Sequence, residues 1–169
     1  EIYLDKSELH TLIEYTKRFT PASKEYQILK MYQFSCFCGL RFSDAMDLEW
    51  RHIDFQNNLI RKIMIKTKTE VITPLFPMAC EILLEKIRHK AIKDTDKIFY
   101  QYAEPTVNQT LRHQTRLAGI DKHITYHSSR HTFATLLVMD GVDIYKISKY
   151  LGHKSVNMTQ RYLKYDLSI

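Results

Sequence analysis

Two short stretches near the end of the chain combine side chains that hold phosphate with one that can attack it. The first, HSSRH, contains His127, Arg130 and His131, and the second, LGHKSVNMTQRY, contains His153 and Tyr162. Guanidinium and imidazole groups donate hydrogen bonds to phosphate oxygens, and an activated tyrosine hydroxyl is a nucleophile. These residue types are suited to cutting and rejoining a phosphodiester, provided that the fold brings them to one place.

The first stretch is open to two other interpretations. His127 and Arg130 are three residues apart at the start of an expected helix, so their side chains share a face near the positive end of the helix. That position favours an anion, but on the spacing alone a solvated basic face is the better interpretation. His127 and His131 also have the spacing of two metal ligands on one helix. However, no glutamate lies between them, and no carboxylate follows on the helix as a third ligand.

The second stretch is equally ambiguous when it is taken alone. His153 follows Gly152 in a turn, where an imidazole can donate to a phosphate or simply be exposed, and Leu151-Gly152 also resembles the turn of a helix-turn-helix. Tyr162 is one of eleven tyrosines. A phenol, with a pKa of about 10, needs a base or a positive field to become a nucleophile, and Tyr165 is the competing candidate.

Basic side chains at two upstream places fit the same chemistry. Arg41 lies in the glycine-bearing bend CGLRFSD, and a guanidinium that binds phosphate through two nitrogens needs such a fixed approach. Asp44 is a candidate to orient it, while an ordinary surface arginine is the alternative. Lys66 and Lys68 are expected near the tip of a β-hairpin.

Helical periodicity dominates the elements that must position these groups. A first helix is expected to be capped by Ser7 and ended by Pro21, and Ser43 is expected to cap the third. The remaining apolar patterns predict helices over 26–38, 44–50, 77–92, 104–117, 128–139, 144–151 and 155–165. Strands over 59–66 and 70–75 form the hairpin. The expected fold is one mainly α domain over residues 1–169 with a small antiparallel β-hairpin.

Composition narrows the class of protein. A net charge of +6 and a pI near 9.1 favour a polyanionic partner. The odd set of Cys36, Cys38 and Cys80 indicates buried free thiols in a reducing cytoplasm and disfavours a zinc site. No window approaches the ~18 apolar residues of a membrane span, and the first residues do not have the pattern of a signal or transit peptide.

Four blocks in order, GLRFSDAMDLEWRHIDF, KTKTEVITPL, HSSRHTFATLL and LGHKSVNMTQRY, resemble the catalytic domain of the tyrosine recombinases, the phage integrase family. The resemblance covers essentially the whole chain and is strongest to integrases of phages and mobile elements and to Xer-like relatives. By position it implies a catalytic set of Arg41, Lys66, His127, Arg130, His153 and the nucleophile Tyr162, with Asp44 and His131 in support. Ser128 and Ser129 stand where relatives often have other residues.

The resemblance implies a cytoplasmic, bacterial enzyme that cuts and rejoins DNA strands through a covalent 3′-phosphotyrosyl intermediate, without metal, cofactor or ATP. Its partner would be double-stranded DNA, bound as a homotetramer on two duplexes with accessory DNA-bending proteins. A further DNA-binding domain is expected before Glu1, and the short segment after Tyr162 leaves exchange of a tail between subunits open. The alternatives are a type IB topoisomerase, a catalytically degenerate helix-turn-helix module and a metal-dependent nuclease.

Overall fold

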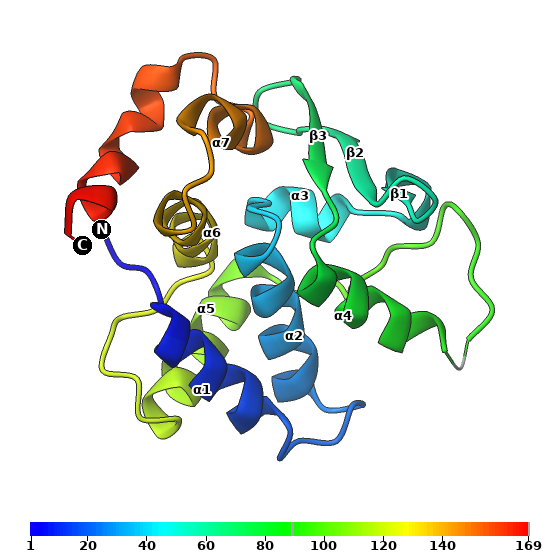
Figure 1. Cartoon of the computed structure of the whole chain (residues 1–169). Helices are drawn as coiled ribbons and strands as arrows, with labels where there is room; N and C mark the ends of the chain where they lie inside the picture. The colour runs from blue at the N-terminus through cyan, green and yellow to red at the C-terminus, as the bar shows by residue number, and fades with distance from the viewer. Residues whose placement is uncertain (89, 169) are drawn as a thin grey trace.

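The structure, a computed structural model, describes residues 1–88 and 90–168, without the side chains of residues 165–168. Helices make up most of the molecule, and a small sheet lies at its edge, at the upper right in Figure 1. This confirms the mainly α fold. The α-helices are α1 (Lys6–Thr16), α2 (Lys24–Cys36), α3 (Phe42–Asp47), α4 (Pro77–Ile87), α5 (Glu104–Leu117), α6 (Ser128–Met139) and α7 (Ile144–Leu151). Three 3₁₀ segments complete the helical set: η1 (Trp50–His52), η2 (Val156–Met158) and η3 (Gln160–Ser168).

Two of the predicted helix caps are wrong. Asp5, and not Ser7, caps α1, because its carboxylate accepts from the Glu8 amide at 2.8 Å while the Glu8 carboxylate accepts from the Asp5 amide at 3.0 Å. This reciprocal pair satisfies two of the free amides at a helix start. Arg41 takes the cap position of α3, so Ser43 lies within the helix.

Several helix ends also differ from the prediction. The third helix ends at Asp47, with Trp50 in a separate 3₁₀ turn, and α4 ends at Ile87, before Ile92. The helix predicted over 155–165 is replaced by the 3₁₀ segments η2 and η3. Because no α-helix follows Gly152, the described chain does not form a helix-turn-helix at this turn.

The sheet has one strand more than the predicted hairpin. Strand β1 (Ile53–Asp54) pairs antiparallel with β2 (Leu59–Ile63), which pairs antiparallel with β3 (Glu70–Pro74). Since β2 ends at Ile63, Lys66 lies in the connecting turn instead of in the strand.

Helix α7 packs on this sheet. The Thr73 hydroxyl of β3 donates to the Tyr150 carbonyl at 3.4 Å. Gly152, at φ +70°, ends α7 so close to the sheet that a Cβ there would lie 2.9 Å from Cγ2 of Val71. Both contacts fix the start of the segment that carries His153.

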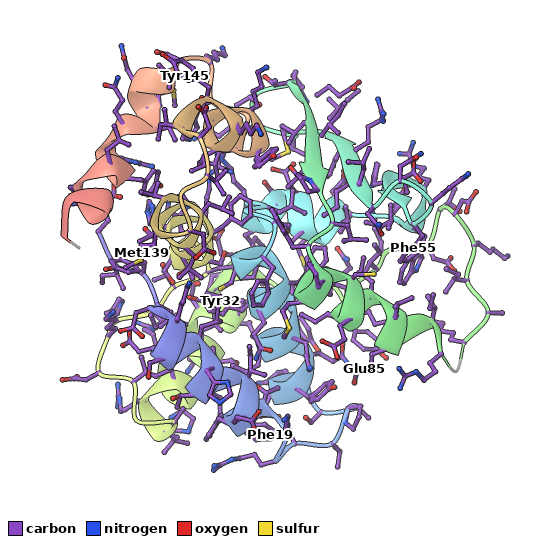
Figure 2. The ribbon with its side chains drawn as sticks, in the orientation of Figure 1. Phe19, Tyr32, Phe55, Glu85, Met139 and Tyr145 are labelled. Carbon is purple, nitrogen blue, oxygen red and sulfur yellow. The ribbon has the colours of Figure 1, made fainter. Side chains whose placement is uncertain are left out.

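Helix α6 is the central element of the core. It contacts α2, α7 and η3, and its residues 128–135 are all buried. Tyr32 of α2 lies in the interior (Figure 2), and its hydroxyl is 2.7 Å from the Ser128 hydroxyl at the start of α6. Phe133 and Leu137 join a second apolar cluster with α7 and with Tyr162 of η3. Burial on every side holds α6 in one orientation. Within the described residues, no helix is long and apolar enough to cross a bilayer.

Candidate active site

Arg130 is the most constrained of the predicted site residues. It lies on α6 with 2% of its surface exposed. Its Nη1 donates to the Gly39 carbonyl at 2.8 Å, and its Nη2 donates to the Leu151 carbonyl. Gly39 belongs to the bend between α2 and α3, and Leu151 ends α7. Three parts of the chain therefore meet at one guanidinium.

Arg41 places a second guanidinium beside the first. Burial lowers the pKa of Arg130 to about 9, and the charge of Arg41 contributes to this shift. The Nη1 atom of Arg41 is buried and has no hydrogen-bond partner among the described residues. A buried donor without a partner is rare in a folded protein. Next to a second cation, it is a ready site for an anion that accepts from both.

The two histidines of the predicted set lie near this arginine pair. His127 occupies the cap position of α6 and is exposed. Its pKa is lowered by burial and by the charges of Arg130 and Arg41. Nδ1 of His153 is 2.6 Å from the Thr159 hydroxyl, and burial together with Arg130 lowers the pKa of His153 to about 4. The His153 ring is therefore neutral at neutral pH in the free protein.

Tyr162 lies in η3 with 1% of its surface exposed. Its hydroxyl is 2.7 Å from Nδ1 of His131 and accepts a hydrogen bond from Nη2 of Arg161 at 3.0 Å. Burial raises the pKa of Tyr162, while Arg161 and Arg130 act in the opposite direction. The Glu1 carboxylate pairs with Nη1 of Arg161 at 2.9 Å, and Glu1 lies beside η3 (Figure 1). The side chain of Tyr165, the competing nucleophile, lies outside the described residues.

Asp44 holds the turn that contains Lys66 through a hydrogen bond. Its Oδ1 accepts from the Ile65 amide at 2.8 Å and lies 3.9 Å from Nζ of Lys62, which also pairs with Asp47 at 2.6 Å. Lys66, the next residue after Ile65, is exposed. Asp44 therefore anchors the β2–β3 turn to α3, which begins directly after Arg41. Its orienting effect on Arg41 stays a prediction.

Two contacts in this region were missed by sequence reasoning. The Glu1 carboxylate pairs with Arg161 beside the tyrosine, and the buried Lys62 lies next to Asp44. Lys62 could have been found, because it shares the inward period of β2 with Ile60. Glu1 carried no such signal, since its pairing with Arg161 joins distant parts of the sequence.

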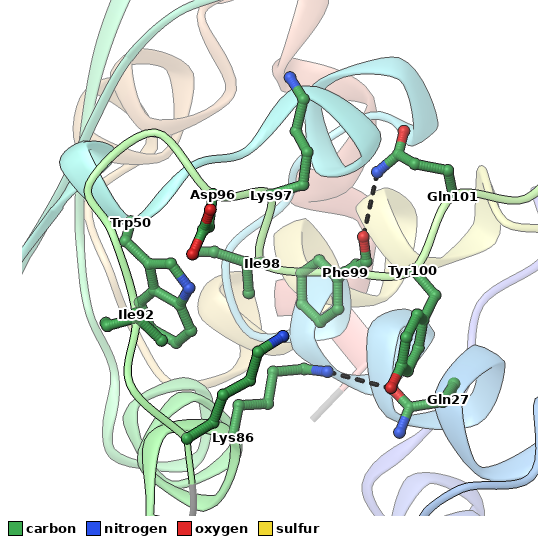
Figure 3. Close-up of a pocket in the computed structure, with 11 residues that line it drawn as sticks. Gln27, Trp50, Lys86, Ile92, Asp96, Lys97, Ile98, Phe99, Tyr100 and Gln101 are labelled. Atoms are coloured by element: carbon green, nitrogen blue, oxygen red, sulfur yellow. Dashed lines mark hydrogen bonds between the residues drawn. The ribbon is translucent and has the colours of Figure 1, made fainter.

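A cavity of about 380 Å³ lies apart from this site, between the end of α4 and residues 92–101 (Figure 3). Nζ of Lys86 donates to Oε1 of Gln27 at 3.1 Å there and lies 5.0 Å from the centre of the Phe99 ring. Burial lowers the pKa of Lys86 to about 8. None of the predicted site residues lines this cavity. The two regions are distinct.

Comparison with known proteins decides the family. The profile of the phage integrase family matches residues 3–167, nearly the whole chain. The chain belongs to the phage integrase family. Among its relatives, the tyrosine recombinase XerC of Rickettsia bellii (strain OSU 85-389) is 35% identical over 134 residues, which are 75% of this chain and 43% of XerC. A tyrosine recombinase of Pseudothermotoga lettingae is 31% identical over 164 residues, 95% of this chain and 55% of the relative.

Solved structures of integrases and recombinases share the fold. XerA recombinase superposes with a TM-score of 0.75 at 27% identity, over 96% of this chain and 58% of XerA. The catalytic domain of bacteriophage HP1 integrase gives a TM-score of 0.68 at 20% identity, over 96% of this chain and 87% of that domain. The chain spans about half the length of the curated relatives it matches. Its fold is that of a tyrosine recombinase catalytic domain.

Proposed function

We propose that this chain is the catalytic domain of a site-specific DNA recombinase that cuts and rejoins strands through Tyr162. The observation that carries the proposal is the pair of guanidiniums in which Arg130 is fixed by two carbonyls and Arg41 keeps a buried donor free among the described residues. A phosphodiester supplies the acceptor oxygens that such a pair lacks. The charge of Arg130 also acts on Tyr162, so the pair lies near the nucleophile.

Each side chain then has a role in the reaction. The Tyr162 oxygen attacks phosphorus, a 3′-phosphotyrosyl bond forms, and the bond from phosphorus to the 5′ oxygen breaks. Arg41, Arg130 and His153 stabilise the negative charge that builds on the non-bridging oxygens. Lys66 protonates the departing 5′ oxygen, and His127 assists proton transfer at the tyrosine. A second 5′-hydroxyl reverses the step without ATP, because the phosphotyrosine preserves the bond energy.

Double-stranded DNA is the proposed partner. The net charge of +6 favours a polyanion. XerH recombinase, bound to its difH substrate in a solved structure, shares this fold with a TM-score of 0.76 at 20% identity, over 100% of this chain and 54% of XerH. In the full-length protein we propose an additional N-terminal DNA-binding domain, a homotetramer on two duplexes and accessory DNA-bending proteins.

The decisive experiment traps the covalent intermediate. We expect the wild-type chain to form a covalent product on a library of nicked duplexes of random sequence, and Tyr162→Phe to form none while still binding DNA. Tyr145→Phe is the matched control, because Tyr145 is exposed on α7 (Figure 2). If the product persists in Tyr162→Phe and disappears in Tyr165→Phe, the nucleophile has been misassigned.

Three further observations separate the alternatives. Relaxation of supercoiled DNA without strand exchange would indicate a type IB topoisomerase. DNA binding without any cleavage would indicate a degenerate binding module. Cleavage that a chelator abolishes would indicate a metal-dependent nuclease.

A further inference from the structure

We propose that His131 is the immediate proton acceptor for Tyr162, taking the phenol hydrogen on Nδ1 as the tyrosine oxygen attacks phosphorus. This inference rests on the proposed function and assigns a catalytic step within it. It differs from the role given to His127, whose ring meets the His131 ring edge-on at 4.7 Å between centroids. His127 is thus one ring further from the nucleophile.

The contacts of the Tyr162 oxygen leave the phenol able to donate to His131. Arg161 lies 3.0 Å from the Tyr162 oxygen through Nη2. A guanidinium only donates, so the phenol oxygen is the acceptor in that contact and its single hydrogen is not used there. Nδ1 of His131 is 2.7 Å away from the same oxygen. In the proposed tautomer, His131 accepts at Nδ1 and carries its own hydrogen on Nε2.

The surroundings keep the His131 imidazole able to accept. His131 is 9% exposed, and its pKa is lowered to about 4. Burial is the largest cause of this shift, His127 and Arg161 act in the same direction, and the Glu1 carboxylate opposes them. Burial also raises the pKa of Tyr162, so a free phenolate is scarce at neutral pH and the attack needs a base within reach.

One group beside the ring favours the product of the transfer. Oε2 of Glu1 lies 3.5 Å from Nδ1, and its charge favours the imidazolium against the other groups around the ring. Arg161 stabilises the developing negative charge on the tyrosine oxygen. His131 directly follows Arg130 on α6, so one rigid helical turn holds both the phosphate clamp and the base.

The step is balanced in atoms and charge. The O–H bond of Tyr162 breaks, and an N–H bond forms at Nδ1 of His131. The tyrosine oxygen bonds to phosphorus, and the 5′ oxygen leaves with a proton from Lys66. On religation His131 returns its proton to Tyr162, and Lys66 recovers a proton from the attacking 5′-hydroxyl.

The test compares His131→Gln with Lys66→Ala on two nicked substrates, an ordinary phosphodiester and a 5′-bridging phosphorothiolate. A thiolate leaves without being protonated, so the second substrate should restore Lys66→Ala. It should not restore His131→Gln, which lacks a base on the opposite side of phosphorus. We expect His131→Gln to form the covalent product at least about 100-fold more slowly on both substrates, the usual contribution of a general base.

Two further readouts distinguish a base from a residue that only positions the tyrosine. The wild-type rate should be nearly constant between pH 6 and 8, whereas the His131→Gln rate should rise about tenfold per pH unit as the phenol ionises unaided. Added imidazole should partly restore His131→Ala. His10→Gln, an exposed histidine of α1, is the matched control, and thermal unfolding and DNA binding check that each variant is folded.

Defined outcomes overturn the inference. A wild-type rate in His131→Gln would show that the contact only positions Tyr162, and so would a loss without any change in the pH profile. Rescue of His131→Gln by the phosphorothiolate would place its role at the leaving group. Glutamine keeps an acceptor for the phenol, so His131→Gln can still be used for the test if His131→Ala does not fold. Covalent product from Tyr162→Phe would instead refute the proposed function.

Discussion

The guanidinium of Arg130 makes hydrogen bonds that hold the fold together and is also the proposed phosphate ligand. It is nearly fully buried, and it donates to the carbonyls of Gly39 and Leu151. An arginine held in this way is already oriented when a phosphate arrives. Preorganised charge of this kind is usually the largest single contribution to catalysis.

Replacing Arg130 with alanine should reduce formation of the covalent complex by at least about 100-fold, since one preorganised donor is worth that much. Arg130→Lys should also be impaired, because a lysine cannot make both carbonyl contacts and still present a planar pair of donors. Single-turnover cleavage measures both variants. Arg88→Ala, at the exposed end of α4, is the control. An unchanged rate in Arg130→Ala would refute the clamp.

Residue types predicted part of this chemistry. Histidine, arginine and tyrosine at family positions pointed to a phosphate site, and the structure places Arg41, His127, His153 and Tyr162 within the electrostatic influence of Arg130. The contact of His131 with the tyrosine could not be predicted, because η3 was expected to be an α-helix and side-chain pairing depends on how that segment is wound.

The bend between α2 and α3 shows how an element places Arg41, one of the proposed catalytic groups. Gly39 has a φ of +76°, which disfavours a side chain. A Cβ there would also lie 2.6 Å from the Phe133 ring of α6. The bend therefore requires glycine for two reasons: its backbone has a positive φ, and it lies too close to α6 for a side chain.

Gly39→Ala should destabilise the protein more than Gly141→Ala. Both positions have positive φ, and each alanine is expected to lose about 1 kcal/mol for that reason. Gly141 has open space around it, whereas Gly39 meets Phe133, so Gly39→Ala should lose about 1–3 kcal/mol more from overpacking. Urea unfolding measures the difference. Equal losses of stability in the two variants would show that the bend accommodates a Cβ without disturbing α6.

Element boundaries were predicted less well than element types. Most of the helices and the hairpin occur where the apolar pattern placed them, since the pattern reports the buried face directly. Capping depends on which polar side chain reaches a free amide. Asp5 and Glu8 make that contact for α1, and nothing in their spacing excluded Ser7. The two-residue strand β1 is too short to show a period.

At the scale of the whole molecule, two neutral histidines link folding to pH. His131 and His153 have pKa values of about 4 in the folded protein, against an ordinary value of 6.5. Between these values the unfolded chain binds protons that the folded chain does not. Stability from these groups is therefore complete above pH 6.5 and is lost as the pH falls towards 4.

The free energy of unfolding should fall between pH 6.5 and pH 4.5, with each histidine contributing up to about 1.4 kcal/mol per pH unit. His153→Gln should reduce this slope, because one of the two proton-binding differences is removed. Urea unfolding at several pH values measures it, with His10→Gln as the control. An unchanged slope in His153→Gln would show that the histidine is protonated equally in both states.

The fold as a whole followed from the sequence more readily than the closeness of its two ends. The four ordered blocks led to the family, and the family profile spans nearly the entire chain. Glu1 and Arg161 instead pair across the full length of the sequence, and no local pattern encodes such a contact. Long-range ion pairs of this kind depend on tertiary packing, which becomes visible only in three dimensions.

The anchoring of Arg130 by two carbonyls has a consequence for when the proposed site can form. If α7 separates from the body, Leu151 no longer holds the guanidinium, and His153, which follows α7 closely, is displaced with it. We therefore expect a molecule that has lost this docking to be unable to carry out the proposed cleavage. Docking of α7 would then act as a safeguard, because the proposed site is complete only in the fully folded chain.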